Sequence, residues 1–367
     1  MKILKYILLS LLLWGASSFS LVAFGQSVGS NVSYLTYILL LLYYFFSKKR
    51  RFLLPMILLG LSYFIISGFI YVDDSEEYIY EFIKYLIIVI CGAELARNTT
   101  RKEFSYFLLI GAMSIIIHSV VYADAYGRYS GFYLNPNGAA FVCLIGYCLT
   151  FGISNKAVKY FLIFTFTFAG VLTFSRFFFL MWLIITLISI ASDKKNIQLL
   201  GIGFATLAIL ISAAAILQVN TERFSILLEI IDYNLQTSKL TEDTRLESWA
   251  KYYEDILANP IFGNGFKSFS GMVNVKQGVH NTFLMVIGEA GLIPFFIILG
   301  FYFYMLKLTF KVYKEEMYKF LIAVLLIAIL MVMHNYFNNE IILFVTIWLY
   351  VRLDNRAIQV ELTSQKF

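Results

Sequence analysis

The chain has 367 residues, of which 60% are hydrophobic and only 14% are charged, and its formal net charge is +6. Soluble domains contain roughly 45–50% apolar and about 25% charged residues, so this composition excludes an ordinary soluble domain. Apolar runs of about 18 or more residues recur, and each is long enough to cross about 30 Å of hydrocarbon as a helix. The runs are continuous and do not alternate, which indicates membrane helices and excludes a closed barrel.

In chain order, the sequence predicts an all-α, polytopic integral membrane protein with about 12 transmembrane helices. These are expected at residues 1–24, 32–46, 52–72, 78–96, 104–122, 139–153, 160–174, 177–191, 197–217, 282–306, 320–333 and 341–351. The first run resembles a signal peptide, but its apolar character continues to Phe24, so we expect an uncleaved span. The chain then divides into spans one to nine (1–217), a large loop (218–280), and the last three spans with a short tail (281–367).

Basic residues predict the orientation of these helices. With both termini in the cytoplasm, the clusters at 48–51, 97–102, 194–195 and 307–319 all fall on the cytoplasmic side, with most of the 29 Lys and Arg. Short cytoplasmic loops are enriched in Lys and Arg, so this rule explains the net charge without nucleic acid as a partner. The large loop then faces outward from the cytoplasmic membrane, into the periplasm or the cell-wall space.

The large loop at 218–280 is the longest polar interval of the chain and carries helix signals. Apolar periodicity predicts one helix at 222–235 and a second that starts near Thr241 or Thr244 and stops at Asn259-Pro260. The second helix would present one apolar stripe, made of Leu246, Trp249, Tyr253, Ile256 and Leu257. We therefore expect amphipathic helices that lie at the membrane interface or roof a cavity between spans.

Three arginines stand on the outer side, where topology does not require them. Arg245 lies in the first turn of a predicted helix, which disfavours a cation unless an anion binds there; an ion pair with a neighbouring glutamate is the alternative. Arg176 interrupts an apolar region beside Ser175, and an arginine at membrane depth marks a functional site unless it reaches the interface. Arg128 precedes the sixth span, where it would contact a ligand or a lipid head group.

Histidines supply the remaining chemistry. His280 precedes Asn281 at the outer mouth of the tenth predicted span and suits a general base, with a structural role as the alternative. His334-Asn335 is a second such pair at the end of the eleventh. His118 is expected to be packed or hydrogen-bonded, and Glu289 to pair inside the bundle, away from the site of His280.

The cysteines predict no metal chemistry. Cys91, Cys143 and Cys148 all fall in apolar runs, where a free thiol packs as a small hydrophobe. Their spacing matches no metal-binding pattern. We therefore expect neither a metal ion nor another cofactor.

Four short elements follow one another along the second two-thirds of the chain. They are RYSGFYLNPNGAA at 128–140, with Asn135 and Asn137; TFSR at 173–176; Arg245-x-x-x-Trp249 with NPIFGNG at 259–265; and HNTFL at 280–284 with Glu289-x-Gly291. Each element alone is weak, but their order and spacing together resemble the O-antigen polymerase and O-antigen ligase superfamily of bacterial inner membranes. Phe177 departs from the pattern, since the family often has glycine after the S-R arginine.

The resemblance implies glycosyl transfer on the outer face of the membrane, from a sugar chain on undecaprenyl diphosphate. Arg176 and Arg245 would bind the diphosphate, with Arg128 as a further contact, and His280 would be the base. Substrate-binding roles would fall to Asn135, Asn137, Trp249 and Asn281.

The function expected is a polymerase that joins lipid-linked repeat units into O-antigen or capsular polysaccharide. A ligase that transfers polymer to lipid A-core or another acceptor shares the same motifs. A lipid-oligosaccharide flippase or other transporter is the alternative from another class, and it would place charges through the bundle midplane. The partners implied are the lipid-linked oligosaccharide, the bilayer and a chain-length regulator.

Overall fold

The computed structural model of the chain describes residues 1–72, 74–122, 128–217, 245–271 and 278–364. Within these ranges, the side chains of 210, 211, 213–217, 245–247 and 354–364 lie outside the description. The loop helix predicted at 222–235 also lies outside the described residues. Thr244, at the predicted start of the second loop helix, lies outside them too, so both stay predictions.

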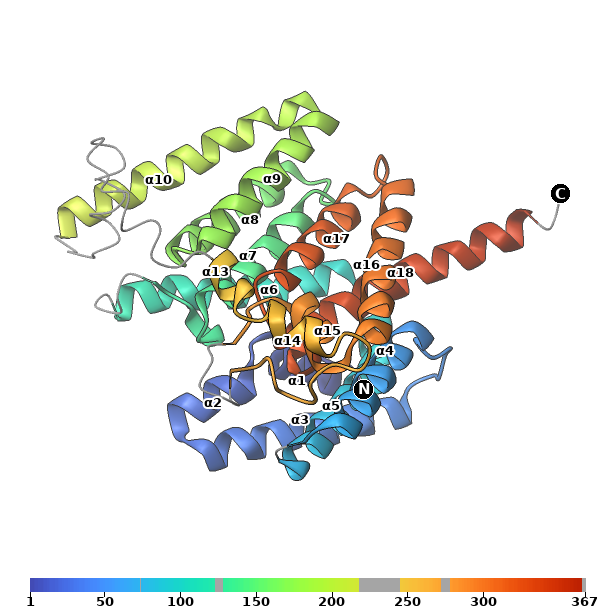
Figure 1. Cartoon of the computed structure of the whole chain (residues 1–367). Coiled ribbons are helices and arrows are strands. Elements are labelled where there is room, and N and C mark those ends of the chain that lie inside the picture. The colour runs from blue at the N-terminus through green and yellow to red at the C-terminus, as the bar shows by residue number, and fades with distance from the viewer. Residues whose placement is uncertain (73, 123–127, 218–244, 272–277, 365–367) are drawn as a thin grey trace.

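All regular structure in the described part of the chain is helical, which confirms the all-α class (Figure 1). The first part contains α1 (Lys2–Leu13), α2 (Ala16–Phe24), α3 (Gln26–Phe46), α4 (Leu54–Ile70), α5 (Ser75–Arg97), α6 (Arg101–Val121), η1 (Gly131–Tyr133), α7 (Pro136–Thr150), α8 (Lys156–Leu172), α9 (Arg176–Ser192), η2 (Lys194–Ile197) and α10 (Gln198–Leu217). After the large loop follow α13 (Arg245–Ala250), α14 (Tyr253–Ala258), α15 (Thr282–Ala290), α16 (Leu292–Lys311), α17 (Met317–Leu330), η3 (Tyr336–Asn338) and α18 (Glu340–Ser364).

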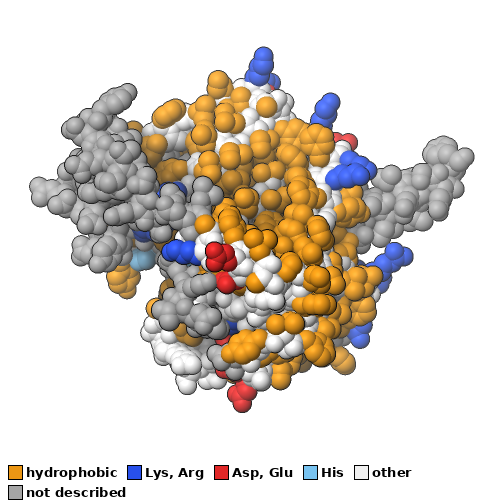
Figure 2. Space-filling view, viewed as in Figure 1, with side chains coloured by type: hydrophobic (Ala, Val, Ile, Leu, Met, Phe, Trp, Pro, Cys, Tyr) orange, Lys and Arg blue, Asp and Glu red, His pale blue; other side chains and the backbone are white. Residues whose placement is uncertain are grey.

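Several of these helices fit a membrane. Helices α3, α6 and α16 are long and apolar enough to cross it, and α1 with α2 makes a fourth span if the bent pair counts as one. Helices α4, α7, α9 and α17 are apolar but have 10–17 residues, so at 1.5 Å per residue they are shorter than about 30 Å of hydrocarbon. Figure 2 shows hydrophobic side chains over much of the surface, which fits contact with lipid. The count of twelve spans stays a prediction.

Two of the predicted spans are broken, so the expectation of single continuous helices there is wrong. The span predicted at 1–24 consists of α1 and α2, which meet at 63° around Gly15, whose φ of +58° favours glycine. The span predicted at 282–306 is divided at Gly291, with φ +77°, into α15 and α16. A Cβ at Gly291 would lie 2.0 Å from the carbonyl oxygen of Ile261, because the preceding chain packs directly against the break.

Residues 259–265, which we call the clamp, satisfy the backbone at this break. Three hydrogen bonds join them to it: Asn264 N donates to Gly288 O (2.7 Å), Gly265 N to Glu289 O (3.0 Å) and Leu292 N to Pro260 O (3.1 Å). Backbone groups inside a membrane need partners within the protein. The clamp therefore lets a helix end and restart where lipid alone would leave its carbonyls unpaired.

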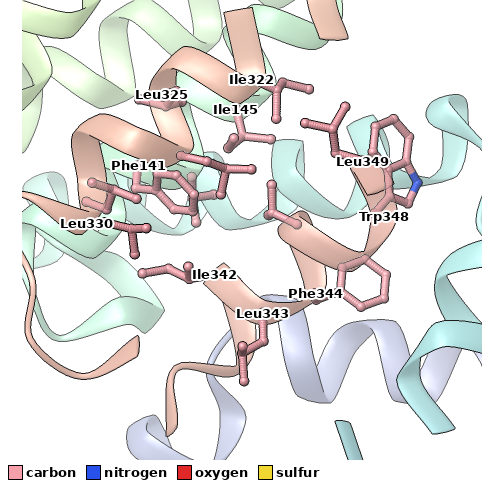
Figure 3. Packing of buried hydrophobic residues seen from close by; sticks show 14 of the residues in the cluster. Phe141, Ile145, Ile322, Leu325, Leu330, Ile342, Leu343, Phe344, Trp348 and Leu349 are labelled. Atoms are coloured by element: carbon pink, nitrogen blue, oxygen red, sulfur yellow. The ribbon is translucent and has the colours of Figure 1, made fainter. Parts of the chain in front are cut away.

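The core lies where α7, α17 and α18 meet (Figure 3). Every residue of α7 from Ala139 to Thr150 is buried, so this helix is central to the bundle. Phe141 and Ile145 of α7 pack among residues of α17 and α18 that include Ile322, Leu330 and Trp348. Lipid is as apolar as these side chains, so close van der Waals packing, and not the hydrophobic effect, stabilises the contact.

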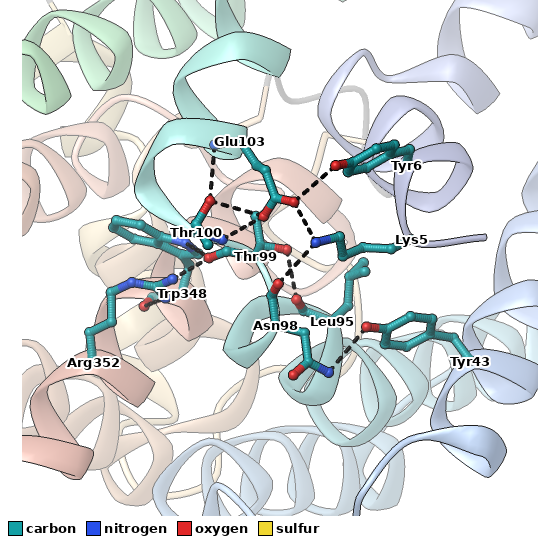
Figure 4. Close-up of polar contacts among 10 residues, drawn as sticks. All are labelled: Lys5, Tyr6, Tyr43, Leu95, Asn98, Thr99, Thr100, Glu103, Trp348 and Arg352. Carbon is teal, nitrogen blue, oxygen red and sulfur yellow. Dashed lines mark hydrogen bonds and ion pairs between the residues drawn. The ribbon is translucent and has the colours of Figure 1, made fainter. Parts of the chain in front are cut away.

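The bundle has two chemically different ends. At one end, α5, α7, α9 and α18 begin and α17 ends; we call it the site end. At the other, α5 ends and α6 begins between Arg97 and Arg101; we call it the basic end. Figure 4 shows the basic end, where Lys5 lies 2.5 Å from Glu103 and the Arg352 guanidinium donates to the Thr99 carbonyl oxygen.

Candidate functional site

A cavity of about 510 Å³, the large cavity, lies at the site end. Its walls come from the α1–α2 junction, the first turns of α5, the η1–α7 junction and the segment around η3. Its polar lining consists of Ser17, Ser18, Glu77, Tyr80, Glu81, Lys84, Asn135, Asn335, Asn338, Asn339 and Glu340. Apolar side chains such as Phe132, Phe141 and Ile342 complete it. Both its volume and its mixed lining are typical of small-molecule sites, which measure roughly 300–1,000 Å³.

A second cavity of about 140 Å³, the small cavity, adjoins the large one, because Glu81, Asn335 and Asn338 line both. The shared wall is itself ordered, since Asn338 Nδ2 donates to Glu81 Oε1 over 3.1 Å. His334 and Ser270 line the small cavity.

An ion-pair cluster joins the chain after the clamp to α5. Lys267 Nζ lies 2.5 Å from a carboxylate oxygen of Glu77 and 2.9 Å from one of Glu81. Burial disfavours the charged ammonium, but Glu81 and Glu77 outweigh it and raise the pKa of Lys267. Sequence reasoning missed this cluster: the acidic run before α5 marked only a span boundary, and its partner lies far along the chain.

The motif element at 128–140 and the motif element at 173–176 meet at the N-terminus of α7. Asn135 caps that helix, with its side-chain oxygen accepting from Asn137 N (2.8 Å) and Gly138 N (3.4 Å). The Asn137 oxygen in turn accepts from Ser175 Oγ over 2.7 Å. The NPN and S-R elements, predicted separately from sequence, are therefore joined directly by a side-chain hydrogen bond.

Arg176 is the first residue of α9, in the tight hairpin expected from the sequence. Ser175 caps the helix by accepting from Phe178 N, and Phe174 turns the chain with a φ of +46°. The Arg176 side chain is exposed, and it has no hydrogen bond or ion pair within the described residues. A guanidinium beside a helix N-terminus concentrates positive potential, which suits an anion.

Arg128 lies next to the same hairpin. Tyr129 N donates to the Leu172 carbonyl oxygen over 3.2 Å, which fixes the half-buried Arg128 beside the end of α8. His118 supports this loop, since its Nδ1 accepts from Ser130 N (3.3 Å) and Gly131 N (3.1 Å). The prediction that His118 is hydrogen-bonded is confirmed.

His280 and His334 form a pair that the sequence did not predict. Their Nδ1 atoms lie 3.2 Å apart, and the rings meet edge to face with centroids 4.7 Å apart. The sequence predicts two separate His-Asn pairs, because 54 positions separate the two histidines and no periodicity connects them. Burial, followed by the proximity of His280, lowers the pKa of His334 to about 4.

The segments that carry the two histidines are tied together. Thr282 Oγ1 donates to the Met333 carbonyl oxygen over 2.7 Å. Asn281 is buried and caps α15, accepting from Phe283 N (2.9 Å) and Leu284 N (3.2 Å). Its predicted role in substrate binding remains a prediction, but the side-chain oxygen already has a structural task.

The second loop helix is described from Arg245 onward, and it ends sooner than the sequence predicts. It stops at Ala250, and α14 starts at Tyr253, so the predicted apolar stripe is partly wrong. Tyr252 is buried against Phe269, with ring centroids 4.7 Å apart, while Tyr253 and Leu257 are exposed. After the break Tyr253 and Leu257 therefore face away from the core, whereas Ile256 of the same stripe is buried in it.

Two further residues of this element were predicted to belong to the site. The Arg245 side chain lies outside the described residues, so its role stays a prediction. Trp249 is partly buried against the core.

Glu289 pairs inside the bundle, as predicted. It is fully buried and accepts hydrogen bonds from Phe269 N (3.0 Å), Ser270 Oγ (3.1 Å) and the hydroxyl of Tyr63. It thus joins α15 to α4 and to the chain after the clamp, and does not contribute to the histidine pair. The three cysteines are likewise buried and free, as expected.

The predicted residues fall into two groups at one end of the bundle. Asn135, Asn137, Arg176 and Arg128 surround the α7–α9 corner, and His280 pairs with His334. The large cavity connects the groups, since Asn135 and Asn335 both line it. In the described part of the chain, no group of three or more His, Cys, Asp or Glu residues could hold a metal ion.

Neither the scan against protein-family models nor the search of curated proteins finds a match for this chain.

Proposed function

We propose that this protein is a membrane glycosyltransferase that polymerises oligosaccharide repeat units carried on undecaprenyl diphosphate. It would act in the bacterial cytoplasmic membrane, with both termini in the cytoplasm and the site end outward. The product would be O-antigen or a capsule-like polysaccharide.

The observation that supports this proposal is that motif residues distant in sequence lie at one end of the bundle, beside the large cavity, which Asn135 lines. The Asn137–Ser175 hydrogen bond joins two motif elements, and the large cavity adjoins both this corner and the segment of His334. A transporter would need charged groups through the bundle midplane. Arg176, Asn135 and His280 instead lie at helix ends, which favours a reaction at one face.

The residue types suit a lipid-diphosphate donor. Arginines bind phosphate oxygens through two parallel N–H bonds and neutralise the charge of a departing diphosphate. Arg176 is exposed at a helix N-terminus for this task, and Arg245 and Arg128 would assist it. Arginines would thus take the part that Mg²⁺ plays in many phosphate-transfer sites.

The large cavity suits the sugar. Amide and carboxylate side chains such as Asn135, Asn335 and Glu340 can bind hydroxyl groups, and the rings of Phe132 and Phe141 offer apolar faces. His280 would take the proton of the attacking hydroxyl. If the hydroxyl displaces the diphosphate directly, the anomeric configuration inverts, and a product with the donor's configuration would contradict this route.

A ligase that transfers finished polymer to lipid A-core uses the same residues and is the second candidate. The acceptor distinguishes the two, since a polymerase adds to another lipid-linked chain. A chain-length regulator is the protein partner that the polymerase reading implies.

The test is genetic and chemical. A strain lacking the protein is complemented with wild type, Arg176→Ala, Arg245→Ala, His280→Ala or, as the matched control, Arg50→Ala, an exposed arginine at the basic end. Membrane abundance of each variant is measured, and extracted glycans are separated on a gel. Single repeat units on the final acceptor in the deletion and in the three site variants support a polymerase. Polymer that accumulates on undecaprenyl diphosphate indicates a ligase, and an intact ladder in all variants overturns the site.

A further inference from the structure

We propose that His334 is a positioning residue for His280: its Nδ1 accepts a hydrogen bond from Nδ1–H of His280 and so leaves Nε2 of His280 as the proton acceptor. The inference rests on the proposed function, because it assigns a partner to the base of that reaction. Its test below has a readout that does not depend on activity.

The contact itself limits where the proton can be. Two imidazole nitrogens 3.2 Å apart attract only if one carries a hydrogen and the other a lone pair. Two N–H groups facing each other would repel, and so would two lone pairs. The pair therefore shares one proton between its Nδ1 atoms.

Exposure decides which ring donates. His280 is exposed, whereas His334 is half-buried and its pKa is lowered to about 4, first by burial and then by His280. A positive charge that arises during the reaction consequently resides on His280. An imidazolium has N–H on both nitrogens, so the His280 Nδ1 must donate and the His334 Nδ1 must accept.

The surrounding chain holds both rings in place. A Cβ on Gly278 would lie 2.8 Å from Cε1 and from Nε2 of His334, so the His334 ring packs directly on the Gly278 backbone. The bond from Thr282 Oγ1 to the Met333 carbonyl oxygen joins the neighbouring residues. His280 itself adopts a left-handed φ of +47°, a strained conformation that persists only where its surroundings enforce it.

The other charged groups near the pair have their own partners. Glu81 and Lys267 line the small cavity with His334, but they form an ion pair that also includes Glu77. Glu289 receives the Ser270 hydroxyl and the Phe269 N–H. Within the described residues, these carboxylates are therefore engaged elsewhere, and His334 fills the position that a carboxylate takes in many base-orienting pairs.

In the proposed reaction one bond forms at the anomeric carbon and one bond breaks. The acceptor hydroxyl gives its proton to Nε2 of His280 while its oxygen forms a bond to the anomeric carbon. The bond from that carbon to the diphosphate oxygen breaks, and the diphosphate leaves with the electron pair. The Nδ1–H···Nδ1 contact becomes charge-assisted at that moment, which stabilises the protonated base.

The experiment measures the pKa of His280 directly. Purified protein in detergent is treated with diethyl pyrocarbonate, which modifies neutral imidazole, and modification of each histidine is followed by mass spectrometry from pH 5 to 8. The chain has only three histidines, so His118 is the internal control. The variants are His334→Leu, which removes the acceptor, and His334→Asn, which keeps a side-chain oxygen at the δ position. Gly278→Ala moves the ring of His334 without changing its chemistry.

We expect His334→Leu to lower the His280 pKa by about half a pH unit or more, because the imidazolium loses its acceptor. His334→Asn should restore it, and Gly278→Ala should give a smaller decrease. An unchanged pKa in His334→Leu overturns the proposal, and a raised pKa shows that His334 is the donor. Melting temperatures of the variants separate this effect from misfolding.

Activity distinguishes the failure of the two proposals. If His280→Ala leaves the glycan ladder intact, the proposed function fails, whatever the pKa measurement shows. If that ladder is lost but the pKa of His280 does not respond to His334→Leu, only the positioning role fails.

Discussion

The two ends of the helical bundle use charge differently, although both contain ion pairs. At the basic end, Lys5 pairs with Glu103, Arg97 with Glu94 and Lys319 with Glu316. At the site end, Arg176 is exposed without a partner among the described residues, and two adjoining cavities lie between the motif elements. Cations with partners stabilise the fold, and a cation held in place without one is available to a ligand.

Backbone geometry follows the same division. The described residues with left-handed φ that are not glycine, Leu134, Phe174, Lys267 and His280, all lie at the site end. Such conformations cost of order 1–3 kcal/mol each and cluster at functional sites. The site end therefore holds strain that the regular packing of the basic end lacks.

The largest expected effect concerns activity at the site end. His280→Ala should lower the rate of glycan polymerisation by about 10²–10⁴-fold, the usual contribution of a general base, while the melting temperature stays close to wild type. Polymerisation of purified lipid-linked repeat units, followed by gel, measures the rate. A parallel loss of stability would show that His280 has a structural role, which would contradict the functional role assigned to the site end.

Next comes stability at the basic end. Trp348 is fully buried, donates to the Thr99 carbonyl oxygen (3.0 Å) and carries the Arg352 guanidinium 3.7 Å above its ring. Trp348→Ala should destabilise the protein by about 3–5 kcal/mol, as for other buried aromatic residues. Thermal unfolding in detergent measures this, with the exposed Lys156→Ala as control. Equal melting temperatures for Trp348→Ala and wild type would mean that packing at the basic end does not stabilise the fold.

Only part of this fold can be predicted from local sequence patterns. The helical class and the hairpin at Ser175-Arg176 follow from local apolar runs and capping residues. The break at Gly291 does not, because it depends on residues 259–265 packing against the glycine. The break at Gly15 does not either, because a glycine within an apolar run does not by itself indicate a left-handed φ.

The residues of the candidate site also divide into those that local sequence indicates and those that it does not. Arg176 and His280 stand out locally as polar residues at apolar boundaries. His334 and Lys267 matter only through partners that are distant in sequence, and no periodicity in a single chain indicates such pairs.

An intermediate effect is expected where the site end does contain an ion pair. Lys267→Met removes the ammonium between Glu77 and Glu81 and leaves two carboxylates close together. Loss of hydrogen bonds to charged groups should cost about 1.5–3 kcal/mol, seen as a lower melting temperature. Adding Glu77→Gln and Glu81→Gln should recover part of it, and no recovery would show that Lys267 acts through packing alone.

The smallest effect is a pH dependence. The pKa of His334 is about 4 in the folded protein, below the ordinary value of about 6.5. Protons therefore bind the unfolded chain more readily, so stability is present above pH 6.5 and is lost as the pH falls towards 4. The melting temperature of wild type should fall more over this interval than that of His334→Asn. Identical slopes would contradict the lowered pKa.

The clamp has a consequence for how this protein can diversify. Residues 259–265 are bonded to the backbone on both sides of Gly291, so this part of the large loop is tied to the helix break. The interval 218–244, which precedes Arg245, can then be exchanged as a cassette, longer or shorter, without moving the helix break or His280. Acceptor preference could thus evolve, or be engineered by loop grafting, over an unchanged catalytic base.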